Sequence, residues 1–283
     1  MNRPQAGSWG NELNDLVRAL SGTFLFGAPL LFTMEMWWIG LYSEGWKLLT
    51  LLALALAANL GLASTVGFHR GATLAHAIDQ AVDAMAMGVL AALVVLLTLH
   101  RLTFSDPLGA ILGKVIIQAV PLSIGASAAN AIFGGNGRDD EGQGAGRAEG
   151  PVRATLHDLG STAIGAVFIG FGIAPTDEVP LLVAGMGPLH ILATVGLSLM
   201  VTYAIVHASG FDPYAAPSYS ASLIRRPITE TLTAYAVSLG LAFVMLYLLD
   251  RISLDDPLPH IVAHSVVLAL PASIGGAAGR LAV

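Results

Sequence analysis

The stretch Thr33-Met34-Glu35-Met36-Trp37-Trp38 closes a long apolar run near the start of the chain. Adjacent Trp residues at the end of such a run are typical of the aromatic belt at a membrane interface. Glu35 precedes Trp38 by about one helical turn, so we expect it just inside that interface. A related stretch, Thr176-Asp177-Glu178, recurs in the second half of the chain. Together the two stretches predict a duplicated membrane protein organised around an acidic residue and its copy.

The composition excludes an ordinary soluble domain. Apolar residues make up 55% and charged residues 11% of the 283 residues, and the mean hydropathy is +0.72. A soluble domain has about 25% charged residues, and the charges here are too few to cover its surface. The absence of Cys excludes disulfides and thiolate metal sites, and the net charge of −6 argues against nucleic-acid binding. The solvent of this protein is therefore expected to be the lipid bilayer.

Eight apolar segments follow one another along the chain, each close to the roughly 20 residues that a helix needs to cross a bilayer. They are rich in Ala and Leu and do not alternate with polar residues, so we expect helices and not strands. The predicted spans are 18–41, 47–68, 78–99, 107–133, 158–176, 182–207, 228–249 and 257–280. The predicted fold class is an all-α polytopic membrane protein with eight transmembrane helices.

Glycine and charged residues crowd the segment between the fourth and fifth spans, which favours a flexible linker. The predicted organisation is a cytoplasmic N-terminal segment at 1–17, a first four-helix repeat at 18–133, a flexible cytoplasmic linker at 134–154 and a second four-helix repeat at 155–283. Residues 11–20 have roughly helical spacing and are either a short interfacial helix or the first turn of the first span. The polar residues 1–14 lack the features of a cleavable signal peptide, and we expect none.

Positively charged residues predict the orientation. Nine Lys or Arg residues lie at the termini and in the even-numbered loops, against three in the loops on the opposite side. Because Lys and Arg are enriched on the cytoplasmic side of membrane proteins, both termini are predicted to be cytoplasmic.

An internal repeat relates the two halves. Residues 101–130 match residues 251–280 at eleven of thirty positions without gaps, and Pro121-Leu-Ser-Ile-Gly125 recurs as Pro271-Ala-Ser-Ile-Gly275. Four spans is an even number, so the halves should have the same orientation and be related by an axis along the membrane normal. Corresponding residues then lie at equal depth and can face each other across that axis.

Carboxylates near the outer ends of the first spans favour an ion pathway. Intramembrane carboxylates are costly and by default mark ion or proton routes. Two Glu and one Asp around the axis would form an acidic mouth suited to cations, including Ca²⁺, which prefers oxygen ligands. The predicted pathway residues are Glu35, Glu178, Asp177, Thr33 and Thr176. The alternative is that both Glu residues lie at the water boundary or pair with a base.

Lys114 and His264 are equivalent under the repeat. Glu35 with Lys114, and Glu178 with His264, would each form an internal ion pair that lowers the cost of burial. Such pairs are either structural or act in gating or proton coupling, and only the second contains a group that titrates near neutral pH.

Three further features complete the candidate set. Asp83 lies about one turn inside the third span and either lines an inner mouth or acts as a helix N-terminal acid. His260 and His264 have a spacing that can hold a metal, but no Glu-rich context accompanies them, so the metal stays undetermined. No catalytic or nucleotide-binding motif occurs, and we expect neither an enzyme nor a cofactor.

The run from Gly27 to Trp37 (GAPLLFTMEMW) and the later Ala174-Pro-Thr-Asp-Glu178 resemble a family of bacterial integral membrane proteins of uncharacterised function. The resemblance covers most of the chain outside the central linker. It implies a protein of the bacterial inner (plasma) membrane. It implies no activity, so no functional residue is carried over from it.

Two classes of function are compatible with this sequence. The first is a cation channel or cation-coupled transporter for Ca²⁺, Na⁺, K⁺ or H⁺, with the two halves around a pathway. The second is a non-transporting membrane scaffold or sensor in which the charges form structural pairs. An anion pathway lined by Lys114 and His264 is a third option, which the acidic outer loops disfavour. The expected partners are the lipid bilayer and an inorganic cation, and a homo-oligomer is left open.

Overall fold

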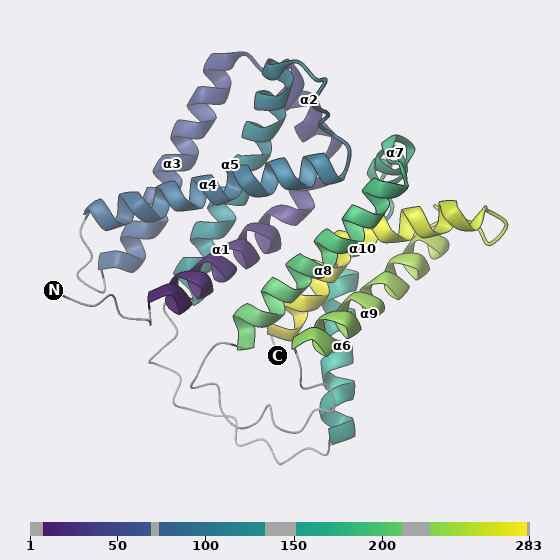
Figure 1. The fold of residues 1–283 in the computed structure, drawn as a ribbon. Coiled ribbons are helices and arrows are strands. Elements are labelled where there is room, and N and C mark those ends of the chain that lie inside the picture. Colours follow the sequence, from purple (N-terminus) through teal and green to yellow (C-terminus); the bar gives the residue numbers. More distant parts are fainter. Residues whose placement is uncertain (1–7, 69–73, 134–150, 211–226, 282–283) are drawn as a thin grey trace.

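The computed structural model describes residues 8–68, 74–133, 151–210 and 227–281, and within these ranges it contains ten α-helices and no strand (Figure 1). The first half contains α1 (Ser8–Leu31), α2 (Met34–Tyr42), α3 (Gly45–Phe68), α4 (Leu74–Thr98) and α5 (Leu108–Phe133). The second half contains α6 (Pro151–Phe171), α7 (Glu178–Gly185), α8 (Pro188–Gly210), α9 (Pro227–Leu248) and α10 (Leu258–Leu281). Most of the predicted linker, 134–150, lies outside the described residues, and residues 151–154 already belong to α6.

The first predicted span, 18–41, is not one straight helix. It breaks after Leu31, and α2 leaves α1 at an angle of 86°. Thr33 at the break has an extended backbone, with φ −96° and ψ 115°. The indole Nε1 of Trp37 donates a hydrogen bond to the Leu31 carbonyl at 3.2 Å. Because side chains can satisfy the carbonyls that a helix end leaves free, the chain can stop and turn here at low cost. Residues 11–20 belong to α1 and form no separate interfacial helix.

In the second half the helix boundaries differ from the predicted ones at two places. The break that corresponds to the one after α1 lies between α6 and α7. The predicted span 158–176 is α6, which begins and ends earlier, at Pro151 and Phe171. The predicted span 182–207 is interrupted at Met186 and Gly187, between the short α7 and the long α8. Pro188 explains the interruption, because a proline favours the first position of a helix and disfavours helical structure in the residue before it.

Six of the described helices are long and apolar enough to cross a membrane, or seven if the bent α1–α2 pair is one span. The six are α3, α4, α5, α8, α9 and α10. The prediction of an all-helical protein with several transmembrane helices is confirmed at this level. The predicted spans 47–68, 78–99, 107–133, 228–249 and 257–280 each correspond to one continuous helix.

Each half is built around its last long helix. In the first half α5 packs against α1, α2, α3 and α4, and in the second half α10 packs against α6, α7, α8 and α9. A Cβ on Gly125 of α5 would lie 2.8 Å from the carbonyl oxygen of Gly22 in α1. Gly275 of α10 meets the carbonyl of Gly165 in α6 in the same way. Small residues at these crossings let the backbones approach closely, which is how helices associate within a bilayer.

The two halves meet through different helices. On the first half the contact is made mainly by α1, which packs against α8 and α10 of the second half, while α4 touches α8 (Figure 1). Under the predicted repeat, α6 corresponds to α1 and α3 corresponds to α8. The helices α3 and α6 make no contact comparable to that between α1 and α8. One apolar core runs through both halves and includes Leu31, Leu96 and Ile205. The contacts therefore do not confirm the predicted arrangement of equivalent residues around a shared axis, because the joining surfaces are not the same on the two halves.

The loops before α5 and α10 have matching conformations. His100 and Asp250 both have a positive φ, of 54° and 55°. His and Asp are among the residues that tolerate this left-handed conformation. Asp106 accepts a backbone hydrogen bond from Thr103 at 3.2 Å, and the equivalent Asp256 accepts one from Ser253 at 2.7 Å.

The crossing of α2 on α5 yields a test of the packing. Gly113 lies against the backbone of Gly40, whereas nothing lies within 4 Å of a Cβ built on Gly109, one turn away on the same helix. We expect Gly113→Ala to destabilise the protein by about 1–3 kcal/mol, the usual cost of overpacking. Gly109→Ala should be neutral or slightly stabilising, since Ala favours a helix over Gly by up to about 1 kcal/mol. Thermal unfolding in detergent measures both, and equal effects would contradict the close crossing.

Candidate functional site

The predicted acids lie directly after the two breaks. Glu35 is exposed in the first turn of α2, and Glu178 is half-buried in the first turn of α7. A helix N-terminus stabilises a negative charge at such a position. Because α2 turns away from α1, Glu35 lies beyond the straight part of the first helix and not within it. The two acids belong to separate bundles, since α2 packs against α5 and α7 against α10.

The threonines that precede the acids bind the backbone. Thr33 donates a hydrogen bond to the Pro29 carbonyl at 3.2 Å, and Thr176 donates one to the Ile173 carbonyl at 2.6 Å. Each hydroxyl thus satisfies a carbonyl of the turn before the break. Their lone pairs are not engaged by these bonds, so both residues stay candidates for the predicted pathway.

Asp177 forms an ion pair with Arg251. The Arg251 Nη1 lies 2.7 Å from the Asp177 Oδ1, and its other terminal nitrogen donates to the Pro175 carbonyl. The Asp177 side chain is 84% exposed. Exposed pairs of this kind contribute about 0–1 kcal/mol, so the main effect is to tie the loop before α10 to the loop before α7.

Lys114 has a different partner from the predicted one. Its Nζ donates to the Arg101 carbonyl at 2.8 Å and lies 3.6 Å from the Asp106 carboxylate. The predicted pairing with Glu35 does not form. Helical side chains point towards the helix N-terminus, and a long Lys side chain follows this direction to reach polar groups outside the apolar layer. Asp106 is the carboxylate at that end of α5.

His264 is also not paired with Glu178. It is 3% exposed, its Nδ1 donates to the His260 carbonyl at 2.8 Å, and the two imidazole centroids are 4.0 Å apart. His260 lies 4.0 Å from the Asp256 carboxylate. Within the described ranges no group of three or more His, Cys, Asp or Glu residues could hold a metal ion. Asp83 is exposed on α4.

A polar joint between the halves was not predicted. The Arg101 guanidinium lies 4.7 Å above the Trp37 ring and donates to the Leu181 carbonyl in α7. His100 donates from Nδ1 to the Gly185 carbonyl, and its ring centroid is 4.2 Å from that of His190 in α8. Burial lowers the pKa of Arg101, but a guanidinium keeps its charge in proteins. The loop between α4 and α5 therefore attaches the first half to the second.

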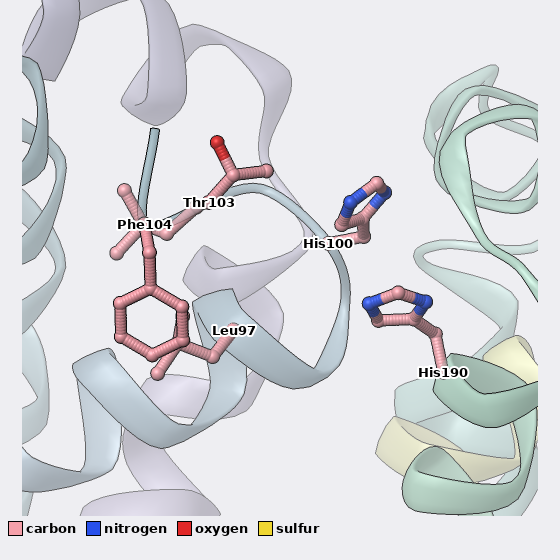
Figure 2. Close-up of a pocket in the computed structure, with 6 residues that line it drawn as sticks. Leu97, His100, Thr103, Phe104 and His190 are labelled. Atoms are coloured by element: carbon pink, nitrogen blue, oxygen red, sulfur yellow. The ribbon is translucent and has the colours of Figure 1, made fainter. Parts of the chain in front are cut away.

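A small hollow accompanies this joint. Figure 2 shows His100 and His190 facing each other from different halves, with Leu97, Thr103 and Phe104 beside them. The hollow has a volume of about 260 Å³. None of the predicted acids lines it. In the sequence the only sign of this joint is a His at each of the two positions, far apart in the chain.

Buried amides form a second feature that the sequence analysis missed. Gln118 is fully buried in α5, with Nε2 3.4 Å from the Leu30 carbonyl and Oε1 without a hydrogen-bond partner. Asn59 is fully buried in α3, with Nδ2 donating to Ser123 at 3.1 Å and Oδ1 unpartnered. An unpartnered buried polar atom costs about 1–3 kcal/mol. The available signal was the presence of single amides within otherwise apolar spans.

The second half has a comparable interior made of hydroxyls. Buried hydroxyl oxygens without a hydrogen-bond partner belong there to Thr202, Tyr235, Ser238 and Ser265. Native interiors leave few polar atoms unsatisfied, and each one calls for a functional or structural reason. Both halves thus contain polar atoms next to their central helix that the protein itself does not satisfy.

Asp106 provides a test of the outer loop. The Thr103 hydroxyl, which donates to it at 2.8 Å, is the main cause that lowers the pKa of Asp106, followed by the Thr103 backbone N–H and the charge of Lys114, while burial opposes them. Thr103→Val should raise this pKa towards its ordinary value. A carboxyl with a lowered folded-state pKa stabilises the protein above its unfolded-state pKa and loses that contribution as the pH falls through the folded-state value. The variant should therefore lose less stability on acidification than the wild type.

Carbon-13 NMR of the Asp carboxyls, assigned with Asp106→Asn, measures this titration. Ser105→Ala is the matched control, because the Ser105 hydroxyl hydrogen-bonds to the Thr103 hydroxyl, whereas the hydrogen bonds to Asp106 in this loop come from Thr103. An unchanged Asp106 titration in Thr103→Val would contradict the predicted role of the hydroxyl.

The comparisons with known proteins concern the chain as a whole. A family model described as "Putative integral membrane protein (DUF2391)" matches residues 15–283. Neither a curated protein nor a solved structure matches the chain. The matched residues include both halves and every candidate residue discussed above. The chain therefore belongs to this family of integral membrane proteins, as the resemblance of its two acidic stretches had indicated.

Proposed function

We propose that the protein moves a small inorganic cation across the bilayer, as a channel or a cation-coupled transporter, with Glu35 and Glu178 as acidic entrances. The observation that carries this proposal is the pair of helix breaks, each of which opens on a Glu in the first turn of a short helix. Interrupted helices with carboxylates near them are a device by which membrane transporters bind ions. The proposed cations are Ca²⁺, Na⁺, K⁺ and H⁺.

The topology that goes with this function is two repeats in the same orientation and eight crossings. In it α1 and α6 are the two crossings beyond the six apolar helices. They have 24 and 21 residues, and at about 1.5 Å per residue each can cover the roughly 30 Å of hydrocarbon. The short α2 and α7 then lie near the outer interface. Both termini are cytoplasmic, and the membrane is the bacterial inner membrane.

The buried polar atoms support a route within each half and not between the halves. Gln118 belongs to α5, and Asn59 of α3 packs against this helix, which contains Pro121. In the second half Ser265 belongs to α10, which contains Pro271. A proline within a helix frees a backbone carbonyl, and such carbonyls serve as ion ligands where they face a polar interior. The region between the halves is occupied by the shared apolar core, so a route along it is not favoured.

A second candidate is a non-transporting scaffold or sensor. Two observations favour it: the acids Asp106 and Asp177 are engaged in ion pairs with Lys114 and Arg251, and the core that joins the halves is apolar. In this case the outer charges only fasten loops to one another.

Ion flux in proteoliposomes separates the two candidates. We would measure Ca²⁺, Na⁺, K⁺ and H⁺ separately for the wild type and for Glu35→Gln combined with Glu178→Gln. The double variant should lose cation flux by at least about tenfold, which corresponds to 1.4 kcal/mol, because the amides cannot attract a cation by charge. Glu44→Gln is the matched control, since Glu44 is an exposed acid of the same outer region that pairs with Lys47.

Flux that persists in the double variant would remove the two acids from the pathway. Absence of flux for all four cations in the wild type, over a range of pH and voltage, would favour the scaffold or sensor.

Gln118 offers a test that separates function from stability. The repeat places Leu268 at the equivalent position in the second half. Gln118→Leu removes a buried amide whose Oε1 has no hydrogen-bond partner and whose Nε2 makes only a long bond to Leu30, so it should raise the free energy of unfolding by about 1–3 kcal/mol. If the amide lines the route, the same variant should lower cation flux. Thermal unfolding and flux measured together test this, and a more stable variant with unchanged flux would exclude Gln118 from the route.

A further inference from the structure

Each half offers two different surfaces for contact, and only one of each is used within the chain. The first half uses its α1 side and the second half its α8 side. Under the repeat proposed above, α1 corresponds to α6 and α8 to α3. A two-fold relation would bring α6 and α3 together as well, and they make no comparable contact. The halves are thus arranged head to tail, and a head-to-tail arrangement leaves one surface of each kind free for another copy.

Burial differs between the equivalent helices as this arrangement requires. The apolar stretch of α8, which has a partner half, is 44% buried, whereas that of α3 is 22% buried. The α6 face is open too, with Ile164 73% and Phe168 80% exposed. Figure 1 shows α3 on the left of α5, and α8 on the right of the first half.

The turns at the outer ends of these helices correspond residue for residue in the sequence alignment and in their backbone hydrogen bonds. The alignment that pairs Glu35 with Glu178 also pairs Lys47 with His190. Lys47 and His190 occupy the same place in their turns, since each backbone N–H bonds to the carbonyl three residues before, at 3.0 and 2.9 Å. The alignment of the later helices pairs His100 with Asp250, and these two have the same positive φ.

The His100–His190 contact within the chain therefore has a counterpart made of Asp250 and Lys47. Within one chain these two residues lie on the two unused surfaces, and their charges are opposite. Asp250 is exposed, and the Lys47 side chain is 51% exposed. Lys47 has an exposed partner within the chain, Glu44, at 3.6 Å. Lipid tails can cover the apolar faces of α3 and α6, but they supply no partner for Asp250.

We propose that copies of this chain associate head to tail in the membrane, with α6 and the loop before α10 of one copy packed on α2 and α3 of the next. Asp250 of one copy pairs with Lys47 of the next, in the position that His100 and His190 occupy within each chain. Such an assembly closes into a ring if the rotation between copies permits. The inference rests on the repeat proposed above and not on cation transport.

Cross-linking tests the interface directly, because the chain contains no Cys. We would treat membranes with a short bismaleimide and compare Lys47→Cys with Asp250→Cys, each alone and both together. The double variant should form covalent oligomers and each single variant none. Two differently tagged chains, one with each substitution, should give a single covalent heterodimer.

His100→Cys with His190→Cys is the matched control and should cross-link within one chain only. Internal cross-linking of this control shows that the joint is intact. With it intact, absence of oligomers in the double variant would overturn the proposal. Oligomers from either single variant would indicate a two-fold interface and would overturn it as well.

A charge exchange provides a second measurement. Native mass spectrometry from detergent should show loss of the oligomer in Lys47→Asp and in Asp250→Lys, and its return when both are combined. Glu44→Gln removes the partner of Lys47 within the chain and should leave the oligomer intact. A combined variant that stays monomeric would contradict the pairing. The result is independent of flux, so failure of the transport proposal would leave it standing, and the reverse also holds.

Discussion

The close crossing of the first and last long helix in each half is the contact on which the rest of the structure depends. In a bilayer, apolar side chains gain little from leaving lipid for one another, so helices associate through backbone proximity and tight packing. Gly22 with Gly125, and Gly165 with Gly275, provide that proximity. The crossings make α5 and α10 the central helices, and the apolar stretch of α10 is 78% buried. Every other helix of a half is arranged around them.

The breaks after α1 and α6 are possible because side chains satisfy the backbone carbonyls at these helix ends. A helix end within or near lipid must have its carbonyls satisfied, and here Trp37 and Thr33 do so in the first half and Thr176 in the second. The short helices that follow present their N-termini, which favour a carboxylate. The acids that stand out in the sequence are therefore explained by local structure before any ion is considered, and flux decides whether they do more.

Under the proposed repeat each joint has two copies, and the copies differ in their chemistry. Lys114 reaches Asp106 and ties the outer loop to α5, whereas the equivalent His264 is buried against His260. His100 and His190 meet within the chain, whereas Asp250 and Lys47 carry opposite charges on surfaces that the chain leaves free. Residues at equivalent positions thus have different surroundings. The α1 and α8 sides are each covered by the other half, whereas the equivalent α6 and α3 sides are not.

The sequence by itself determined the membrane environment and the helical class. It also determined five of the long apolar helices, which are α3, α4, α5, α9 and α10. A chain with so few charges has no other solvent, and a long apolar run can satisfy its backbone in lipid only as a helix. The tertiary structure decided the 86° bend at Thr33, the partner of Lys114 and the joint at Arg101. Spacing could not predict these, because lipid treats all apolar faces alike. Which faces meet depends on where glycines allow backbones to touch and on which carbonyls are left free.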